Sequence, residues 1–523
     1  MNLGEILAVS ARQHPERTAV IWDHGRQRRT YRELNRRADA LAAALGDEVG
    51  VRPQDRVALM MSNSPELLEA LFAVWKAGAT VVPLNARYTQ DEILYHVGDS
   101  EARVLLAGDE FGASLGPIQE KLGLDTLILS GDGSAGLDGS IALEGLLERH
   151  YGRQADVPPT ADDDVAWLAY TSGTTGRPKG AMLTHGNLTF VAVSWLADLQ
   201  RLEPEDVGLV AAPLTHGAGM MALAFVMKAA TQVILQPSGF DTAQFLADVA
   251  EHRVTHTWLV PTQIKMVLDH PGLPDADLSS LKTIVYGGAP MYVEDLKEAI
   301  RRIGPVFVQL FAQSESPMTG TYLRPAEHIL EGPGSERLAS CGYARSGTEV
   351  AILDDKGEPL PPGEIGEICI RCPAVMKGYW KRPDETAETI RDGWLHTGDV
   401  GKMDDQGYVF ILDRTKDMLI SGGLNVYPRE IEEVLLRHAG ISQAAVIGVP
   451  DERWGEAVKA VVVPAAGARL SEAEVIAFAG SQLAGYKKPK SVEFVADLPK
   501  TTIGKIDKKA LRTPYWVGRD RLV

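Results

Sequence analysis

The sequence is poor in cysteine and has no long apolar run, and each shortage excludes a class of protein. Only three cysteines occur among 523 residues, Cys341, Cys369 and Cys372, an odd number that suits a reducing cytoplasm better than a disulfide framework. No stretch reaches about 18 uninterrupted apolar residues, so we expect no membrane-spanning helix. The first twenty residues lack a basic stretch followed by an apolar run, so we expect no signal peptide.

The sequence also has fewer basic residues than acidic ones. Lys and Arg total 53 against 70 Asp and Glu, which gives a net charge of −17. This balance disfavours a nucleic-acid surface, although a small pocket in an acidic protein can still bind an anionic ligand. The length and the 45% hydrophobic content predict two or more domains, because one core rarely grows so large.

Two of the cysteines form a CxxC pattern, Cys369 and Cys372 in "EIGEICIRCP". The segment alternates like a strand, which places the two side chains on opposite faces. The sequence offers no second such pair and no histidine nearby. We therefore expect neither a metal site nor a redox site here.

Short apolar runs alternate with helical patterns over the first two thirds of the chain. Residues 31–46 place Leu34, Ala38, Leu41 and Leu45 on one helical face and end in Gly46, which predicts a helix with a glycine stop. Expected buried strands are 55–61, 80–85, 102–108, 125–131, 207–213 and 232–237. This alternation predicts an α/β fold.

The pattern changes near residue 350. Strands joined by Gly- and Pro-rich turns occupy 348–373 and 407–414, which predicts a β-rich subdomain. A final unit of helices and strands follows "DRTKD". We predict an N-terminal domain over 1–412, a hinge at 413–416 and a small α+β domain over 417–523.

The stretch "YTSGTTGRPKG", residues 170–180, packs no core and follows an apolar strand. Glycines, hydroxyls and Lys179 in such a turn can surround a phosphate. The Walker A pattern is not met, because the glycines and the lysine have different spacing. A polar loop without a ligand is the alternative.

Four further motifs follow in order: "YGGAP" at 286–290, "GWLHTGD" at 393–399, "DRTKDMLISGGLNVYPREIE" at 413–432 and "PKTTIGKI" at 499–506. Together the five motifs strongly resemble the adenylate-forming superfamily of acyl-CoA synthetases, luciferases and peptide-synthetase adenylation domains, over essentially the whole chain. The resemblance implies two α/β subdomains and a β-rich subdomain in the large domain, with a mobile C-terminal domain. It also implies ATP, Mg²⁺ and coenzyme A as reactants or cofactors.

The resemblance assigns a role to particular residues of this sequence. The ATP or AMP site would comprise Thr171, Ser172, Gly173, Thr174, Thr175, Gly176, Lys179, Gly288, Ala289, Pro290, Phe311, Ser314, Asp399 and Arg414. Asp399 would accept hydrogen bonds from the ribose hydroxyls, and Lys416 would be the hinge. The alternatives are a turn aspartate for Asp399 and a solvated charge run for Arg414 and Lys416.

One motif departs from the family. "QLFAQSES" stands where the family has Tyr-Gly-x-Thr-Glu, so Phe311 replaces the stacking tyrosine and Ser314 the phosphate-binding threonine, while Glu315 matches the magnesium ligand. Ala312 replaces the glycine, and its Cβ disfavours positive φ. This difference affects the expected backbone conformation near the adenine and acyl pocket, and it does not change the expected reaction.

The implied reaction has two steps. A carboxylate attacks the α-phosphate of ATP and pyrophosphate leaves; a thiol, normally that of CoA, then displaces AMP from the acyl-adenylate. Lys505 would offset phosphate charge, His216 would lie beside the acyl carboxylate, and Gly423 would line the pantetheine passage. The alternatives are a surface lysine for Lys505, a core histidine for His216 and a turn glycine for Gly423.

The acid itself stays open. The segment around His216 has no acidic residue to bind an ammonium group, which disfavours an amino acid, and a fatty, aryl or polycyclic acid remains consistent. A carrier-protein phosphopantetheine could replace CoA, and a non-catalytic nucleotide- or acyl-binding relative is the third alternative. We expect a cytoplasmic enzyme with a small-molecule carboxylic acid as partner and no nucleic acid. A homodimer is left open.

Overall fold

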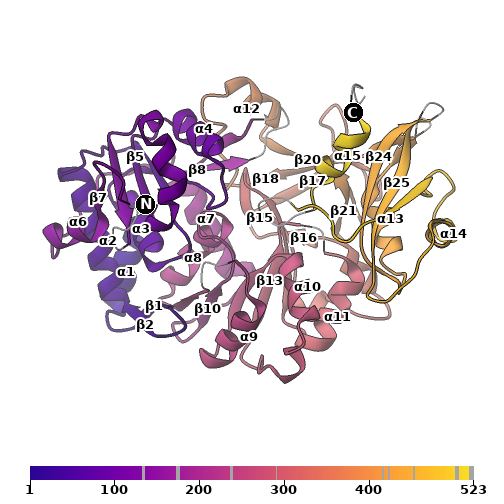
Figure 1. Cartoon of the computed structure of the whole chain (residues 1–523), viewed down its shortest axis with the longest axis horizontal. Helices are drawn as coiled ribbons and strands as arrows, with labels where there is room; N and C mark the ends of the chain where they lie inside the picture. Colours follow the sequence, from indigo (N-terminus) through magenta and orange to yellow (C-terminus); the bar gives the residue numbers. More distant parts are fainter. Residues whose placement is uncertain are drawn as a thin grey trace.

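The structure is a computed structural model, described here over residues 1–131, 136–171, 177–235, 239–289, 291–414, 417–421, 424–451, 454–500 and 506–517. Over these ranges the strands form two large sheets and two five-stranded sheets. Figure 1 shows the first part of the chain (indigo to violet) on the left, the middle part (magenta) below and the last part (orange to yellow) on the right. The predicted fold class, α/β with a large N-terminal part and a small C-terminal unit, is confirmed.

The seven-stranded sheet carries the phosphate-loop motif at one edge. In spatial order its strands are β7 (Ile141–Ala142), β6 (Thr126–Ser130), β5 (Val104–Gly108), β3 (Arg56–Met60), β4 (Thr80–Pro83), β8 (Val165–Thr171) and β9 (Lys179–Thr184). Neighbouring strands are parallel except β8 and β9, which form an antiparallel hairpin.

The nine-stranded sheet carries the adenine and acyl motifs. In spatial order its strands are β16 (Tyr343–Ala344), β15 (Ser316–Leu323), β14 (Phe307–Gln313), β13 (Thr283–Gly287), β12 (His256–Leu259), β10 (Val207–Val210), β11 (Thr231–Ile234), β1 (Thr18–Trp22) and β2 (Gln27–Thr30). Strands β14 to β1 are parallel, and the pairs at both ends are antiparallel.

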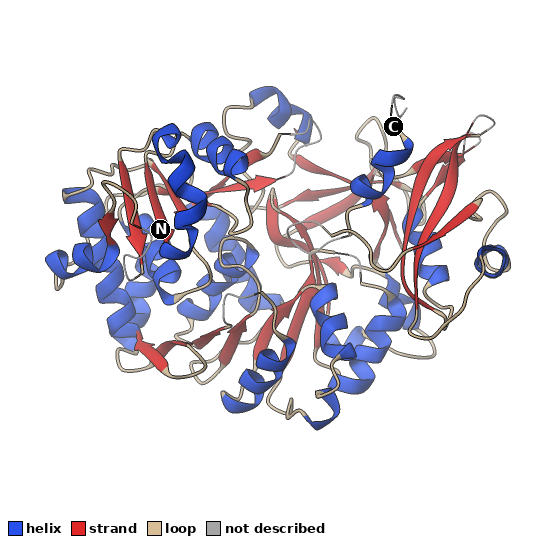
Figure 2. Cartoon of the chain, viewed as in Figure 1, coloured by secondary structure: helices blue, strands red, loops and turns tan. Residues whose placement is uncertain are grey.

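Helices cover both faces of the two large sheets, as Figure 2 shows. They are α1 (Gly4–Gln13), α2 (Tyr31–Asp47), α3 (Pro65–Lys76), α4 (Gln90–Ser100), α5 (Gly112–Leu115), α6 (Leu143–His150), α7 (His185–Asp198), α8 (Gly217–Met227), α9 (Thr242–Glu251), α10 (Pro261–Asp269) and α11 (Val293–Ile303). The largest buried apolar cluster joins α1, α2, α3, α7 and α8 to both sheets. The core therefore fixes the relative placement of the phosphate-loop and acyl motifs.

Helix α2 illustrates how the sequence specifies these elements. The hydroxyl of Thr30 and the Glu33 side chain form a capping box at its start, which satisfies backbone N–H groups that have no helical partner. All four apolar residues of the predicted face are buried. Gly46 does not end the helix, because it lacks the positive φ that a glycine terminator adopts.

The β-rich region and the C-terminal unit each contain one five-stranded sheet. The first comprises β17 (Glu349–Leu353), β18 (Gly366–Arg371), β20 (Trp394–Met403), β19 (Ile390–Arg391) and β21 (Val409–Arg414), with α12 (Pro383–Thr389) beside it. The second comprises β23 (Leu424–Val426), β22 (Leu419–Ser421), β25 (Gly455–Pro464), β24 (Ile441–Asp451) and β26 (Ser491–Phe494), with α13 (Pro428–Leu435), α14 (Glu472–Gly480) and α15 (Lys508–Arg512). Short 3₁₀ turns are η1 (Asp109–Phe111), η2 (Gly116–Leu122), η3 (Leu273–Asp275), η4 (Pro325–Glu327), η5 (Ser335–Ala339) and η6 (Thr513–Tyr515). No helix in the described ranges is long and apolar enough to cross a membrane.

Candidate active site

The two ends of the phosphate-loop motif meet at the β8–β9 hairpin, where Thr171 pairs with Lys179 across the strands. The Lys179 side chain is mostly buried; its Nζ lies 4.4 Å from the centre of the Tyr379 ring and 3.9 Å from a Glu385 carboxylate oxygen. Five of the predicted phosphate-binding residues, Ser172, Gly173, Thr174, Thr175 and Gly176, lie outside the described residues. The described part therefore provides one hydroxyl and one ammonium group at the base of the loop.

Glu315 lies against the same hairpin. Its Oε1 accepts a hydrogen bond from the Thr171 hydroxyl at 3.2 Å and another from the Tyr379 hydroxyl at 2.7 Å. Burial and the Glu315 charge raise the pKa of Tyr379 above its ordinary value, so the phenol remains a donor at neutral pH. The predicted magnesium ligand thus has its carboxylate oriented by two hydroxyl donors on one oxygen.

Asp399 lies on β20 and is 3% exposed. Its Oδ1 pairs with the Nε of Arg414 at 3.0 Å, and its Oδ2 accepts a hydrogen bond from the Gln313 amide at 2.7 Å. Arg414 stands directly opposite it on β21. Two donors therefore orient a buried carboxylate, which is more than a turn aspartate requires.

The adenine motif lies at the carboxyl ends of two adjacent parallel strands. Gly287 on β13 pairs with Leu310 on β14, so the segment that begins at Gly288 and Ala289 lies next to Phe311. Gly288 has φ +77°, and a Cβ there would meet no atom within 4 Å. Pro290 lies outside the described residues. Ligands of open α/β sheets bind at such strand ends.

The β14–β15 turn joins the phosphate side to the ribose side, because Gln313 contacts Asp399 and Glu315 contacts Thr171. Ser314, between them, is exposed. Ala312 does not have a positive φ, so its Cβ causes no backbone strain where the family has glycine. The structure brings Thr171, Lys179, Glu315, Asp399 and Arg414 around this one turn.

His216 precedes α8 and is half-buried, and this burial lowers its pKa. Its Nδ1 lies 3.1 Å from the Thr215 hydroxyl. The next residue, Gly217, lies so close to Trp258 that a Cβ on it would be 2.5 Å from the indole ring. Trp195 packs against Trp258 at a ring distance of 6.1 Å. The residue next to His216 therefore packs against an indole ring.

The hinge-side motif contains a buried charge cluster. The Nζ of Lys508 lies 2.9 Å from Glu432 and 3.9 Å from Asp413. Burial acts to lower the pKa of Lys508, but the two carboxylates outweigh it and the pKa is raised. Glu432 also accepts a hydrogen bond from the Tyr292 hydroxyl at 3.4 Å, so the cluster contacts the large domain. Lys416, Gly423 and Lys505 lie outside the described residues.

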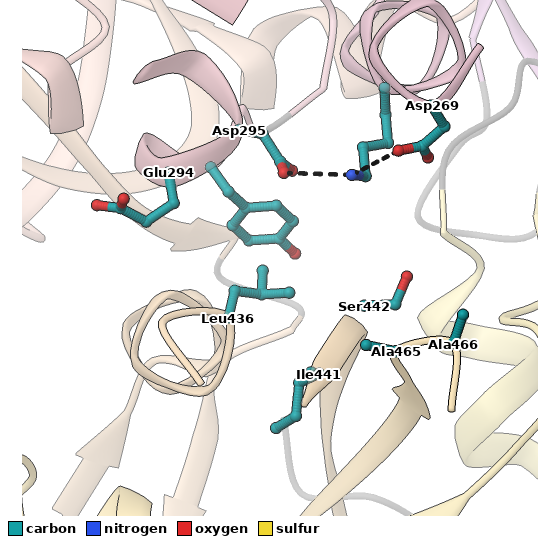
Figure 3. Close-up of a pocket in the computed structure, with 10 residues that line it drawn as sticks. Asp269, Glu294, Asp295, Leu436, Ile441, Ser442, Ala465 and Ala466 are labelled. Atoms are coloured by element: carbon teal, nitrogen blue, oxygen red, sulfur yellow. Dashed lines mark hydrogen bonds and ion pairs between the residues drawn. The ribbon is translucent and has the colours of Figure 1, made fainter. Parts of the chain in front are cut away.

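A cavity of about 400 Å³ lies between α10 and α11 on one side and the C-terminal sheet on the other (Figure 3). Lys265 pairs with Asp269 and Asp295 along its wall. Neither the described phosphate-loop residues nor Asp399 line it. The cavity therefore lies between helices of the large N-terminal part and the C-terminal unit, and it is not part of the candidate site.

Sequence reasoning missed two residues of the site. Tyr379, in "MKGYW", contacts Glu315, and Gln313, the variable position of "QLFAQSES", contacts Asp399. It also missed the neighbour of Cys369: His396, on the adjacent strand, has its Nδ1 3.4 Å from the Cys369 sulfur. The expectation that no histidine lies near the CxxC pattern is therefore wrong in space, since strand pairing joins distant residues.

The chain also matches known proteins over most of its length. The family model for AMP-binding enzymes matches residues 7–380, and the model for the AMP-binding enzyme C-terminal domain matches residues 430–505. Feruloyl-CoA synthases of an Amycolatopsis and a Streptomyces species are 44% identical over 98% of this chain and 99% of theirs. A fatty acid–[acyl-carrier-protein] ligase of Streptomyces coeruleorubidus, ScoC, is 37% identical over 98% of this chain and 96% of its own.

Among solved structures, MatB of Rhodopseudomonas palustris is 34% identical to this chain and is known both with ATP bound and without it. Its ATP-bound form gives a TM-score of 0.88 and covers 98% of this chain and 99% of its own. Its apo form gives a TM-score of 0.77 and covers 98% of each. Over its whole length, this chain superposes better on the ATP-bound structure than on the apo structure.

Proposed function

The chain belongs to the AMP-binding enzyme family and is an ATP-dependent acyl-CoA synthetase, and we propose that the acid it activates is an aryl acid of the feruloyl type. The enzyme converts a carboxylic acid and ATP to an acyl-adenylate with release of pyrophosphate, and transfers the acyl group to the CoA thiol. The activity follows from the family, whereas the identity of the acid is our proposal and rests on the residues around His216.

The observation that carries the aryl proposal is the aromatic surface beside His216. A Cβ on Gly217 would lie 2.5 Å from the Trp258 indole ring, and Trp195 packs against Trp258 with the two rings tilted by 42°. Aromatic rings stack favourably in offset or edge-to-face arrangements, beyond the gain from buried area. The 44% identity to feruloyl-CoA synthases supports the same acid.

We propose that Thr171 and Lys179 bind the β- and γ-phosphates together with residues 172–176, and that Phe311 and residues 288–290 bind adenine. Asp399 and Arg414 would bind the ribose. Glu315 fits a magnesium ligand, because a carboxylate oxygen is the donor that Mg²⁺ prefers, with phosphates supplying most other ligands. When bound, Mg²⁺ would offset charge on the phosphates.

The acid needs no general base, because a carboxylate is already ionised at neutral pH. His216, held neutral by burial, can donate one hydrogen bond to that carboxylate without binding it as an ion pair. The remaining task is to offset charge that develops on the phosphates. We propose that Lys505 does this, supported by its place in "PKTTIGKI".

We propose a large domain over 1–412, a hinge at 413–416 centred on Lys416, and a mobile domain over 417–523. The two MatB forms, which match this chain unequally, support a family in which the arrangement changes with nucleotide. Rotation about the hinge would replace Lys505 with Gly423 at the acyl group, so that the second half-reaction occurs in a different setting.

The experiment is a panel of acids assayed by pyrophosphate release: ferulate, cinnamate, benzoate, decanoate and palmitate. We expect ferulate or cinnamate to give the highest kcat/KM, and Trp258→Ala to lower that value about tenfold while decanoate changes less, because only the aryl acid stacks. Palmitate as the best substrate would refute the aryl proposal.

The acceptor has one alternative with a specific observation in its favour, the 37% identity to a ligase that acylates a carrier protein. A competition assay that offers CoA and a holo carrier protein at equal concentration distinguishes the two acceptors. We expect the CoA thioester. We also propose a cytoplasmic location, supported by the three free cysteines, and a homodimer, which light scattering would test.

A further inference from the structure

The strand that carries Asp399 has an irregular segment at that point. Glu367 pairs with Val400, but Cys369 pairs with His396, so Thr397, Gly398 and Asp399 all stand opposite Ile368. We call this segment the 397–399 bulge. Gly398 has φ +68°. A bulge bends a strand and redirects a side chain, and bulges often lie beside active sites.

Side chains satisfy the backbone groups that the bulge removes from the ladder. The Thr397 hydroxyl donates to the Ile368 carbonyl at 2.6 Å and accepts from the Asp399 N–H at 3.1 Å. The Gln313 amide donates to the Thr397 carbonyl at 2.6 Å. The Gly398 N–H donates to Glu367 Oε1 at 2.8 Å. Glu367 thus provides the acceptor that the regular ladder would have provided.

Glu367 is itself held in place. Its Oε2 lies 2.7 Å from the Nδ1 of His396 and 3.5 Å from the Arg391 guanidinium. His396 is almost fully buried, and Cys369 packs against the same nitrogen. The carboxylate therefore has little freedom to leave Gly398.

Glu367, Cys369 and His396 also have the donor atoms of a metal site, within 4.8 Å of one another. The surroundings favour a different role. A guanidinium nitrogen of Arg391 lies 2.6 Å from the His396 Nδ1, so a cation already occupies the approach to these donors. One Glu367 oxygen is taken by a backbone N–H. The contacts of this cluster therefore fix the position of the Glu367 carboxylate.

We propose that Glu367 is a positioning residue for nucleotide binding, which fixes the 397–399 bulge so that the Asp399 carboxylate faces the ribose. His396 and Arg391 orient Glu367 and do not touch the nucleotide. This inference rests on the proposed ribose contact of Asp399, and it extends the nucleotide site to a residue one strand away.

The test compares four variants by steady-state kinetics: Glu367→Ala, Glu367→Gln, Glu367→Asp and, as control, Glu349→Ala. We expect Glu367→Ala to raise the KM for ATP about tenfold, the usual effect of losing a hydrogen bond to a charged group. The kcat and the KM for the acid should change less than about threefold, because the bulge acts through Asp399 alone. Glu349 pairs with Arg371 on the exposed face of the same sheet, so its variant should match the parent enzyme.

Glu367→Gln and Glu367→Asp distinguish the effect of side-chain length from the effect of side-chain charge. Glutamine keeps an acceptor oxygen at the same distance and should restore most of the ATP affinity. Aspartate keeps the charge but is one methylene too short, so it should restore less. If Glu367→Ala fails to fold, the order of these two variants still decides the question. Aspartate performing better than glutamine would overturn the inference.

Hydrogen exchange of the peptide that contains Gly398 gives a readout without ATP. The Gly398 amide should exchange slowly in the parent and in Glu367→Gln, and faster in Glu367→Ala. Asp399→Ala serves as the benchmark: if it leaves the KM for ATP unchanged, the proposed ribose contact fails, whereas exchange still tests the positioning. A raised KM in Asp399→Ala with a normal KM in Glu367→Ala would overturn the inference, as would one zinc ion per chain that Glu367→Ala loses.

Discussion

Replacing Gln313 should alter ATP binding in a way that depends on the replacement. Its amide donates to Asp399 at 2.7 Å and to the Thr397 carbonyl at 2.6 Å. Gln313→Ala removes a hydrogen bond to a charged group, which contributes about 1.5–3 kcal/mol. Gln313 is half-buried, so we take the lower end, and about 1.4 kcal/mol corresponds to tenfold. The KM for ATP should rise about tenfold.

Gln313→Glu should be worse than Gln313→Ala, because it places a second carboxylate against Asp399. Two charges 2.7 Å apart at an effective dielectric constant of about 20 repel by at most roughly 6 kcal/mol. The pair can relieve this by moving apart or by sharing a proton, which raises the pKa of one carboxyl. ATP affinity should therefore fall more than about a hundredfold at pH 8 and recover partly toward pH 5.5.

Calorimetric titration with ATP at several pH values would measure this, with pyrophosphate release from ferulate as the second readout. Gln313→Ala at the same pH values controls for effects on other groups, since it has no new carboxyl. A Gln313→Glu protein that binds ATP as the parent does at pH 8 would show that Gln313 does not face Asp399 when nucleotide is bound.

Three further predictions concern catalysis and stability. Lys505→Ala should slow adenylation about a hundredfold or more, the effect of removing one electrostatic donor, while thioester formation from supplied acyl-adenylate stays near normal; equal loss in both steps would contradict the proposed role. Gly423→Trp should abolish thioester formation and preserve adenylation, and a fall in both together with the melting temperature would indicate a turn glycine. Burial lowers the pKa of His328 to about 4, whereas the ordinary histidine pKa is near 6.5. As the pH falls below about 6.5, the unfolded chain therefore binds a proton that the folded chain does not bind. This lowers the free energy of unfolding. The unfolding free-energy difference between the parent and His328→Gln should therefore shrink by about 1 kcal/mol from pH 7.5 to 5.5, and urea titrations that show no change would refute it.

The sequence predicted the fold class well because local patterns determined most elements. Helix α2 follows from its apolar spacing, and the Thr30–Glu33 capping box is a feature that the structure adds. The five motifs could be recognised in the sequence because each is contiguous in the chain, and the site that they predict remains a proposal. Gly46 was misread as a stop, since a glycine ends a helix only when its backbone turns left-handed.

The missed residues act through space. Gln313 contacts Asp399, Tyr379 contacts Glu315, and Glu367 contacts Gly398 next to Asp399. Each contact joins segments that lie far apart in the sequence. No spacing in one sequence reveals that contact, because it depends on strand register and on where a bulge occurs. His396 meets Cys369 for the same reason.

The position of Arg414 at the end of β21 has a mechanical consequence. Asp399 pairs with it across the strands, so the proposed ribose grip adjoins the proposed hinge. In a rotation, displacement grows with distance from the axis. Groups near the axis barely move, whereas groups far from it travel a long way. A ribose contact close to the hinge axis can therefore hold the AMP portion in place through both half-reactions. The same domain rotation replaces the residues that surround the acyl group.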